Sequence, residues 1–277
     1  MLKTLISAAS GLFISGLFML ATATAALAGS DEVSPGDVAD FTVLPGWRTD
    51  SGTYMTALRI TLAPGWKTYW RAPGEAGIPP QFDWAGSKNL AAVSFHWPTP
   101  DVFYQNGMRT VGYKRELILP IELSPKQPGQ DIALRARIAL GVCRDICMPV
   151  SVRVSADLTG SGAVDGRIRG ALNDRPDTMR EAGLRDIDCT IEPIADGLRL
   201  TANIDMPRLG PDEVAVFELP DQSIWVSEAE ANRRGRILTA VTEMVPPGNA
   251  PFMLDRSKLR ITVLGAGRAV DIMGCTG

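Results

Sequence analysis

Histidine is nearly absent from this sequence of 277 residues, in which His96 is the single one. A single histidine makes a histidine-rich zinc site, or a Ser-His-Asp triad elsewhere in the chain, a poor candidate. An excess of basic residues is also missing, because 28 Lys and Arg stand against 31 Asp and Glu. Nucleic-acid binding depends on a cationic surface that neutralises phosphates, so nucleic acid is a poor candidate partner.

A long apolar run occurs only at the N-terminus. Met1 to Ala28 begins with the cation Lys3, continues through an apolar stretch from Leu5 to about Leu20, and ends in small residues. This layout is typical of a secretory signal peptide, with cleavage after Ala28. We therefore expect a periplasmic protein that is not inserted in the membrane after cleavage. An uncleaved anchor is the alternative, since the uncharged run could reach across a bilayer.

The chain has ample apolar material for a core, with 45% hydrophobic and 21% charged residues. From Phe41 to about Leu158 it consists of short alternating segments broken by Pro and Gly, which is typical of an all-β fold. Tyr54–Leu62 and Glu116–Glu122 are two predicted strands. A third strand leads into the first cysteine pair, with one face formed by Ile132, Leu134, Ala136, Ile138 and Leu140.

A shift in composition divides the chain. Residues 161–184 are rich in Gly and charge and are expected to form a linker with one short helix, between a domain at 29–160 and a second β-rich domain at 185–277. No predicted helix in the second domain is longer than the charged stretch Ser227–Arg234. Each domain has the size of a small β-sandwich.

Four cysteines in an exported chain suggest two disulfides. Cys189 lies at the start of the second domain and Cys275 two residues from the end of the chain. A bond between them would close a loop of about 87 residues and stabilise the fold by roughly 4 kcal/mol on the chain-entropy model. We interpret this pair as a structural disulfide.

Cys143 and Cys147 are separated by only three residues, so a bond between them constrains the unfolded chain little. Two neighbouring thiols suit thiol-disulfide exchange, in which one sulfur forms a mixed disulfide and the other resolves it without a bound cofactor. Arg144 would stabilise a thiolate and Asp145 would oppose it, so the local charges do not fix the thiol pKa.

Two other uses of this pair stay open at this point. Two thiolates and the thioether of Met148 would suit Cu(I), and the pattern resembles the C-P-D-x-C-P element of Sco-type copper proteins, whose site also takes a distant histidine. The pair could also be a small structural disulfide in an inert scaffold.

Several motifs occur in a specific order: W-x-x-Y-W-R-x-P-G at Trp66–Gly74, Trp97-Pro98, Val111-Gly112-Tyr113, and C-x-x-x-C-x-P at Cys143–Pro149. Together they resemble the N-terminal domain of the thiol:disulfide interchange protein DsbD, and more closely the related ScsB-type proteins. The resemblance covers roughly Val43–Leu158.

The resemblance implies an immunoglobulin-like β-sandwich that carries a redox cysteine pair. It would receive electrons from a membrane-embedded reductase and pass them to periplasmic thioredoxin-like proteins, with no metal or cofactor. By position, Cys147 would form mixed disulfides and Cys143 would resolve them. A cap loop shields the disulfide in this family, and the candidates for cap or partner contacts are Tyr69, Trp70, Glu75 and Tyr113.

Two departures from the family pattern stand out. The spacing between the cysteines is shorter than in typical DsbD proteins. The sequence also contains neither a multi-span membrane section nor a thioredoxin domain with C-x-x-C, so we expect another protein to supply those parts.

Overall fold

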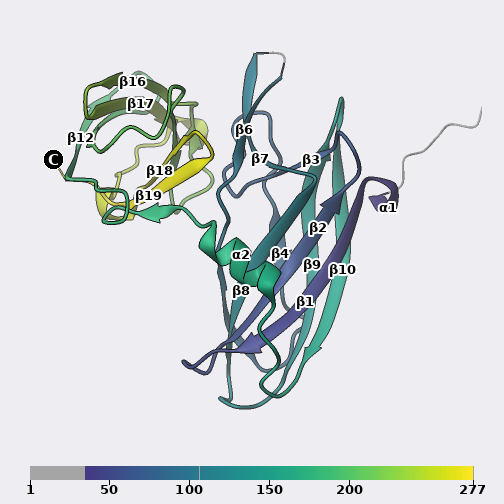
Figure 1. Cartoon of the computed structure of the whole chain (residues 1–277). Coiled ribbons are helices and arrows are strands. Elements are labelled where there is room, and N and C mark those ends of the chain that lie inside the picture. The colour runs from purple at the N-terminus through teal and green to yellow at the C-terminus, as the bar shows by residue number, and fades with distance from the viewer. Residues whose placement is uncertain (1–34, 106, 277) are drawn as a thin grey trace, which may run out of the picture. The chain divides into compact units, whose positions relative to one another are not determined.

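The structure is a computed structural model that describes residues 35–105 and 107–276. The expected signal peptide, residues 1–28, lies outside the described residues. Strands dominate the described part (Figure 1), accompanied by two short α-helices, α1 (Pro35–Val38) and α2 (Gly166–Asn173), and two 3-10 turns, η1 (Pro247–Asn249) and η2 (Arg256–Lys258). None of the helices in this part of the chain combines the length and the apolar content that a bilayer crossing requires.

Two sheets form a first sandwich, which we call the N-terminal sandwich. The four-stranded sheet has the order β1-β2-β8-β5, and the six-stranded sheet has the order β10-β9-β3-β7-β6 with β4 also paired to β9. The strands are β1 (Ala39–Arg48), β2 (Tyr54–Leu62), β3 (Lys67–Tyr69), β4 (Gln81–Asp83), β5 (Leu90–Phe95), β6 (Asp101–Gln105), β7 (Met108–Lys114), β8 (Glu116–Pro125), β9 (Ile132–Cys143) and β10 (Cys147–Leu158).

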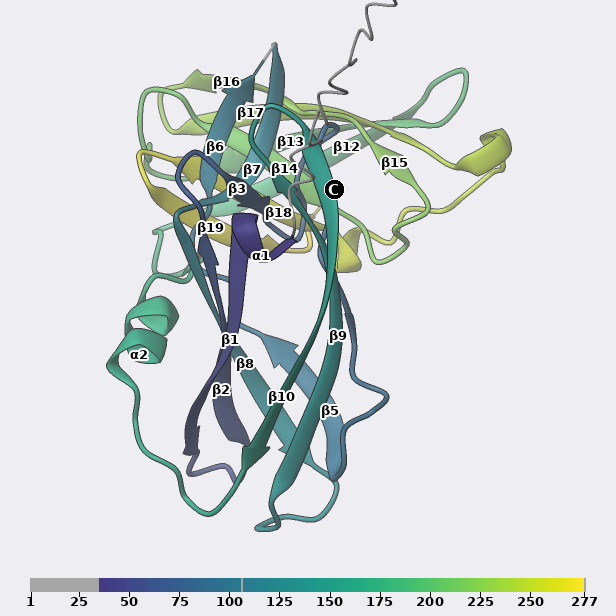
Figure 2. The same ribbon diagram turned by 90° about the vertical axis from the view of Figure 1, so that its right-hand side faces the viewer.

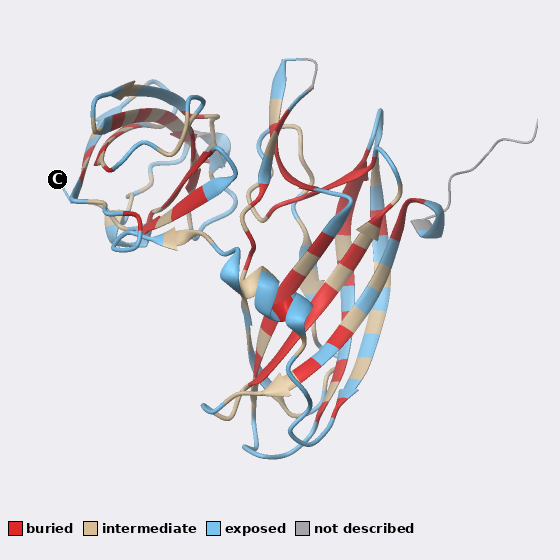
Figure 3. Ribbon diagram, viewed as in Figure 1, coloured by how far each residue is buried: buried red, intermediate tan, exposed pale blue. Residues whose placement is uncertain are grey.

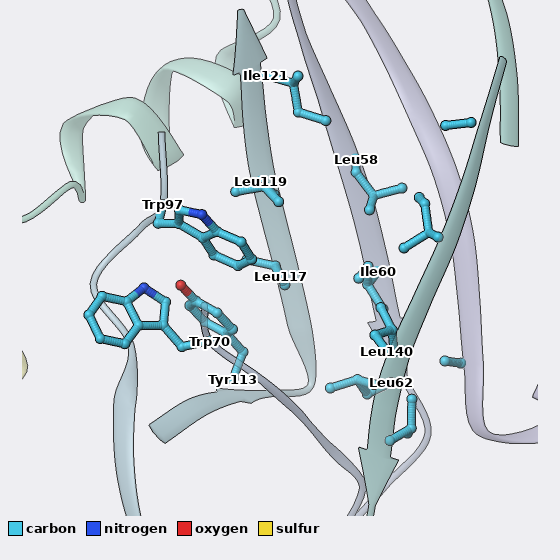
Figure 4. Close-up of a cluster of buried hydrophobic side chains, with 14 of the residues drawn as sticks. Leu58, Ile60, Leu62, Trp70, Trp97, Tyr113, Leu117, Leu119, Ile121 and Leu140 are labelled. Atoms are coloured by element: carbon cyan, nitrogen blue, oxygen red, sulfur yellow. The ribbon is translucent and has the colours of Figure 1, made fainter. Parts of the chain in front are cut away.

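Apolar side chains from both sheets meet between them. The predicted face of β9 is confirmed, because Ile132, Leu134, Ala136, Ile138 and Leu140 are all at most 5% exposed. They pack against residues of β2 and β8, including Leu58, Ile60, Leu117 and Leu119 (Figure 4). The alternation of buried and exposed residues along the strands is visible in Figure 3. The four-stranded and six-stranded sheets thus share one apolar core, as expected for a β-sandwich.

The short helix expected in residues 161–184 is α2. Asp165 caps it by accepting a hydrogen bond from the Arg167 backbone N–H, at 2.8 Å. Ile168 is fully buried and packs with Leu44, Met55 and Ala57. The helix therefore covers the side of the four-stranded sheet that faces away from the main core, beside β8 (Figure 2).

The remaining strands form a second, C-terminal sandwich. One sheet has the order β11-β19-β18-β14, and the other has the order β12-β13-β17-β15 with β16 also paired to β17. The strands are β11 (Asp177–Thr178), β12 (Asp186–Pro193), β13 (Leu198–Asp205), β14 (Val214–Glu218), β15 (Trp225–Val226), β16 (Glu230–Arg234), β17 (Ile237–Val245), β18 (Arg260–Gly265) and β19 (Arg268–Met273).

The prediction of a helix at Ser227–Arg234 is wrong. Glu230–Arg234 is the strand β16, which pairs with β17 from Glu230↔Val241 to Arg234↔Ile237. Its charged residues do not need a helix to be solvated, since an edge strand exposes polar side chains equally well. Residues 230–234 form a strand because they pair with β17. The local sequence pattern gives no information about this long-range pairing.

Residues 35–276 belong to one compact unit, in which the two sandwiches touch. Val214, Leu264 and Ala269 belong to the buried cluster of the N-terminal sandwich, while their sequence neighbours pack into the C-terminal core. Arg71 adds a bidentate ion pair to Glu218, with N···O distances of 2.9 and 3.0 Å. The sheet that contains β14, β18 and β19 is therefore covered on both sides.

The two disulfides close loops of very different length, so they are expected to contribute differently to the free energy of unfolding. The Cys189–Cys275 bond joins residues 86 positions apart, whereas Cys143–Cys147 joins residues only 4 apart. We expect Cys189→Ser/Cys275→Ser to lower the free energy of unfolding by about 4 kcal/mol, and Cys143→Ser/Cys147→Ser by only about 2 kcal/mol. Urea denaturation followed by circular dichroism measures both. Equal losses, or the reverse order, would contradict the loop-closure argument.

Candidate redox site

Cys143 and Cys147 flank the turn of one β-hairpin. Cys143 is the last residue of β9 and Cys147 the first of β10, and the two are direct partners in the antiparallel ladder. They form a disulfide in the structure, with the Cα atoms 4.2 Å apart. Cys143 is 1% exposed, whereas Cys147 is exposed. An incoming thiolate can therefore reach the sulfur of Cys147 more easily than that of Cys143.

The disulfide lies on the outer face of the six-stranded sheet, meaning the face turned away from the core. Successive residues of a strand point to opposite faces, and directly paired residues share a face. Because Val142 faces the core, Cys143 faces outward, and so does Lys67, its partner on β3. Trp66 and Trp70 belong to the core cluster. The motif G-W-K-T-Y-W-R thus alternates between core and outer face.

Tyr69 is the outward-facing residue that reaches the sulfurs. Its hydroxyl donates to Sγ of Cys143 at 2.9 Å and lies 3.1 Å from Sγ of Cys147. Burial raises the pKa of Tyr69 above its ordinary value. The phenol therefore keeps its proton at neutral pH and can donate it in a hydrogen bond to a sulfur that becomes negative.

Glycines on neighbouring segments make room for the Tyr69 ring. A Cβ atom on Gly141 would lie 2.7 Å from Cβ of Ile78 and 3.0 Å from Cε2 of Tyr69. A Cβ atom on Gly77 would lie 3.0 Å from Cδ1 of the same ring. Since real Cβ contacts are wider than this, a larger residue at either position would displace the ring and with it the hydroxyl.

The turn between the cysteines is largely exposed. Arg144 forms a 3.1 Å ion pair with Asp145, and its guanidinium lies 5.2 Å from the centroid of the Trp66 ring. The opposing charges that the sequence places beside the cysteines thus bind each other in solvent. Ile146 is 69% exposed, which leaves an apolar side chain directly before Cys147.

Sequence reasoning missed a second group of residues on the outer face. Lys67 is the one buried lysine among the described residues, and its Nζ donates to Oγ1 of Thr110 at 3.3 Å. The Phe103 ring of β6 lies 5.2 Å from Nζ of Lys67 and 4.5 Å from Nζ of Lys114. Alternation would have placed Lys67 beside Tyr69, but the contact with Phe103 depends on the pairing of β6 with β7.

The other three cap candidates occupy different places. Trp70 is fully buried in the core, and Tyr113 is buried with its hydroxyl donating to the carbonyl of Pro98 at 2.8 Å (Figure 4). Both rings lie near Trp97. Glu75 is exposed, in the turn closed by the hydrogen bond from Gly77 N to Gly74 O. Of the four candidates, the structure brings Tyr69 to the sulfurs.

The possible copper ligands do not gather around the sulfurs. Met148 pairs with Val142 and packs against the core, so it lies on the opposite face of the sheet from Cys147. The imidazole of His96 contacts Glu122, with Nε2 3.1 Å from Oε2. In residues 35–276, no three His, Cys, Asp or Glu side chains are grouped so as to hold a metal ion.

Comparison with known proteins agrees with the motifs. Residues 32–159 match the family model described as thiol:disulfide interchange protein DsbD, N-terminal. The described part of this stretch is similar to the DsbD N-terminal domain, and we call it the DsbD N-terminal-like domain. No curated protein matches the chain. In fold, the chain is similar to the N-terminal periplasmic domain of ScsB from Proteus mirabilis, with 24% identity and a TM-score of 0.68. This similarity covers 88% of the present chain and 96% of that structure.

The fold similarity extends beyond the DsbD N-terminal-like domain, since the family match ends at residue 159 whereas the structural match covers most of the chain. The predicted all-β class, an immunoglobulin-like sandwich followed by a second β-rich one, is confirmed. A role in the thiol-disulfide exchange family is supported by the family match to residues 32–159.

The hydroxyl of Tyr69 can be tested separately from its ring. Tyr69→Phe removes the donor to Cys143 but keeps the ring between Gly77 and Gly141. A hydrogen bond to a charged group is worth about 1.5–3 kcal/mol, so we expect reduction of the Cys143–Cys147 disulfide by dithiothreitol to slow about tenfold or more. Stopped-flow measurement of thiol release gives the rate.

Tyr113→Phe is the matched control, because it removes a hydroxyl that bonds to Pro98 in the core instead of a sulfur. It should lower the melting temperature without slowing reduction. Equal reduction rates for Tyr69→Phe and the unmodified protein would show that the hydroxyl does not assist the sulfur.

Proposed function

We propose that this protein is a periplasmic dithiol/disulfide carrier that exchanges electrons with protein partners through Cys143 and Cys147. The difference in exposure between the two cysteines carries the proposal, since Cys147 is an exposed residue while Cys143 is buried. The DsbD N-terminal family match and the fold similarity to a ScsB periplasmic domain support the same chemistry.

Reduction of the carrier takes two exchange steps. A partner thiolate attacks Sγ of Cys147, the S–S bond breaks, and its electron pair leaves on Sγ of Cys143 as a thiolate. A second thiolate of the partner then attacks the partner sulfur in the mixed disulfide and releases Cys147 as a thiolate. The partner becomes a disulfide, and the carrier gains two electrons and, after protonation, two protons. Oxidation by a substrate disulfide runs through the same steps in reverse.

Tyr69 assists this chemistry at the leaving sulfur. Burial of Cys143 disfavours a charged thiolate, because the group has lost contact with water. The Tyr69 hydroxyl, 2.9 Å from Sγ of Cys143, supplies a hydrogen bond in place of water. A better-stabilised leaving thiolate makes exchange faster.

The partners follow from the family. A membrane-embedded reductase of the DsbD or ScsB type would supply electrons, and thioredoxin-like periplasmic proteins would receive them. The exposed Ile146 next to Cys147 offers an apolar contact to such a partner. Residues 1–28 would direct export and be removed, which places the pair in a compartment where disulfides persist.

The two cysteines should behave differently when changed singly. Cys143→Ser leaves the exposed Cys147 thiol, which can attack a partner disulfide but has no resolving sulfur, so we expect a stable mixed disulfide. Cys147→Ser leaves only the buried Cys143 thiol and should abolish exchange. Non-reducing electrophoresis and intact mass spectrometry after mixing with an oxidised thioredoxin-like protein distinguish the two. If both variants trap the partner equally, or if neither affects transfer, the proposed roles are wrong.

The reduction potential separates a carrier from a structural bridge. We expect the Cys143–Cys147 pair to have a midpoint between about -180 and -270 mV, the range of exchange-active proteins. Equilibration of the protein in redox buffers, followed by alkylation and mass counting of free thiols, measures it. A midpoint below about -300 mV would place this disulfide with structural ones and would refute the carrier function.

A further inference from the structure

Lys67 shares the outer face with the redox cysteines. It is the direct partner of Cys143 in the pairing of β3 with β9, and of Lys114 in the pairing of β3 with β7. Because Cβ atoms of directly paired residues lie about 4.5–5.5 Å apart, the Lys67 side chain starts beside that of Cys143. Tyr69, two residues further along β3, points to the same face and bonds to the sulfurs.

The buried position of Lys67 lowers the stability of the fold. Lys67 is 9% exposed, and burial of an ammonium group is unfavourable. Lys114 lies directly opposite, and two like charges across a strand pair destabilise a sheet. Burial and the charge of Lys114 both lower the pKa of Lys67. A positive charge kept in such surroundings, on the face of the sheet that carries the disulfide, indicates a functional use.

The surrounding residues hold the ammonium group on the outer face. Its Nζ donates to Oγ1 of Thr110 on β7 and lies 5.2 Å from the centroid of the Phe103 ring on β6. The same ring has Nζ of Lys114 4.5 Å away. The negative face of an aromatic ring attracts cations, so Phe103 partly offsets the repulsion between the two lysines. The pairing of β6 with β7 thereby fixes both charges on the face of the sheet that carries the disulfide.

We propose that Lys67 is a positioning residue that stabilises, through its charge, the Cys143 thiolate formed when the disulfide opens. The inference rests on the proposed function and adds a residue that tunes the reduction potential of the Cys143–Cys147 pair. When a thiolate attacks Cys147, the electron pair of the S–S bond leaves on Sγ of Cys143, and the negative charge appears on the face of the sheet that also carries the ammonium group of its strand partner Lys67. Stabilising this form favours the reduced dithiol, which raises the reduction potential.

Other charged and titratable groups near the pair act differently. Arg144 and Asp145, in the turn, pair with each other and are 55% and 83% exposed in their side chains, so solvent screens their field. Tyr69 acts as a neutral hydrogen-bond donor. Lys114 is exposed and contributes in the same direction as Lys67, but more weakly. Among these groups, Lys67 is the cation whose field is least screened by water.

Lys67→Met tests the proposal, because methionine keeps an unbranched apolar stem and removes the charge. We expect the equilibrium constant for reduction of the pair by glutathione to fall about tenfold, which lowers the potential by about 30 mV. The pKa of the Cys143 thiol in the reduced protein should rise, measured by the pH dependence of the ultraviolet absorbance of the thiolate in a Cys147→Ser background, which needs no reagent to reach the buried sulfur. Lys67→Arg, which keeps the charge, should restore both values toward those of the unmodified protein.

Lys88→Met is the matched control. The backbone N–H of Lys88 bonds to the carbonyl of Ala133, ten positions along β9 from Cys143, which corresponds to about 33 Å. Lys88→Met removes the same charge far from the disulfide, so it should leave the reduction potential unchanged. If Lys67→Met does not fold, Lys114→Met serves in its place, with a smaller shift of the same sign.

The proposal is overturned if folded Lys67→Met has the potential and the Cys143 thiol pKa of the unmodified protein, or if Lys67→Arg shifts them as far as methionine does. All of these measurements are made without a protein partner. A failure of the carrier function would instead appear as absent exchange with partner proteins by the unmodified protein, so the two failures are distinguishable.

Discussion

The antiparallel pairing of β9 with β10 is the constraint on which the redox site depends. The register runs without interruption from Ile132↔Leu158 to Cys143↔Cys147, so the two cysteines face each other at the end of a ladder twelve residue pairs long. A shift by one residue would turn the β9 core residues to solvent and Cys143 toward the core. The apolar face of β9 therefore fixes, at a distance, on which side of the sheet the disulfide lies.

The same alternation organises the short strand β3. Its inward neighbours Trp66 and Trp70 anchor the segment in the core, while Lys67 and Tyr69 point to the outer face, where the Tyr69 hydroxyl contacts the sulfurs. Core packing and redox chemistry are thus assigned to alternate residues of a single motif. Because the tryptophans hold the backbone in place, the hydroxyl of Tyr69 is positioned before any partner arrives, and little ordering remains to be done during exchange.

Much of this arrangement could be predicted from the sequence. The faces of β9 follow from strict alternation, and the ordered set of motifs identified Tyr69 together with Trp70, Glu75 and Tyr113, which do not reach the sulfurs. Trp70 and Tyr113 are aromatic residues in the same motifs, and only their strand positions reveal that they face the core. Phe103 and Lys114 lie far from Lys67 in sequence and meet it through two successive strand pairings. Ser227–Arg234 shows the same limit, since pairing with β17 overrides a local pattern.

The two disulfides differ in how much of the chain must be in place before they can close. The hairpin that joins Cys143 and Cys147 is local, and its ends meet with little loss of chain entropy. Cys189 lies in β12, the first long strand of the C-terminal sandwich, and Cys275 follows β19, its last strand. The two cysteines can therefore come together only after most of that sandwich has folded. As the chain is synthesised from its N-terminus, Cys143 and Cys147 can form their bond before Cys275 has been added. The difference in loop length therefore lets the local pair close first, which lowers the chance of a bond between a cysteine of one pair and a cysteine of the other.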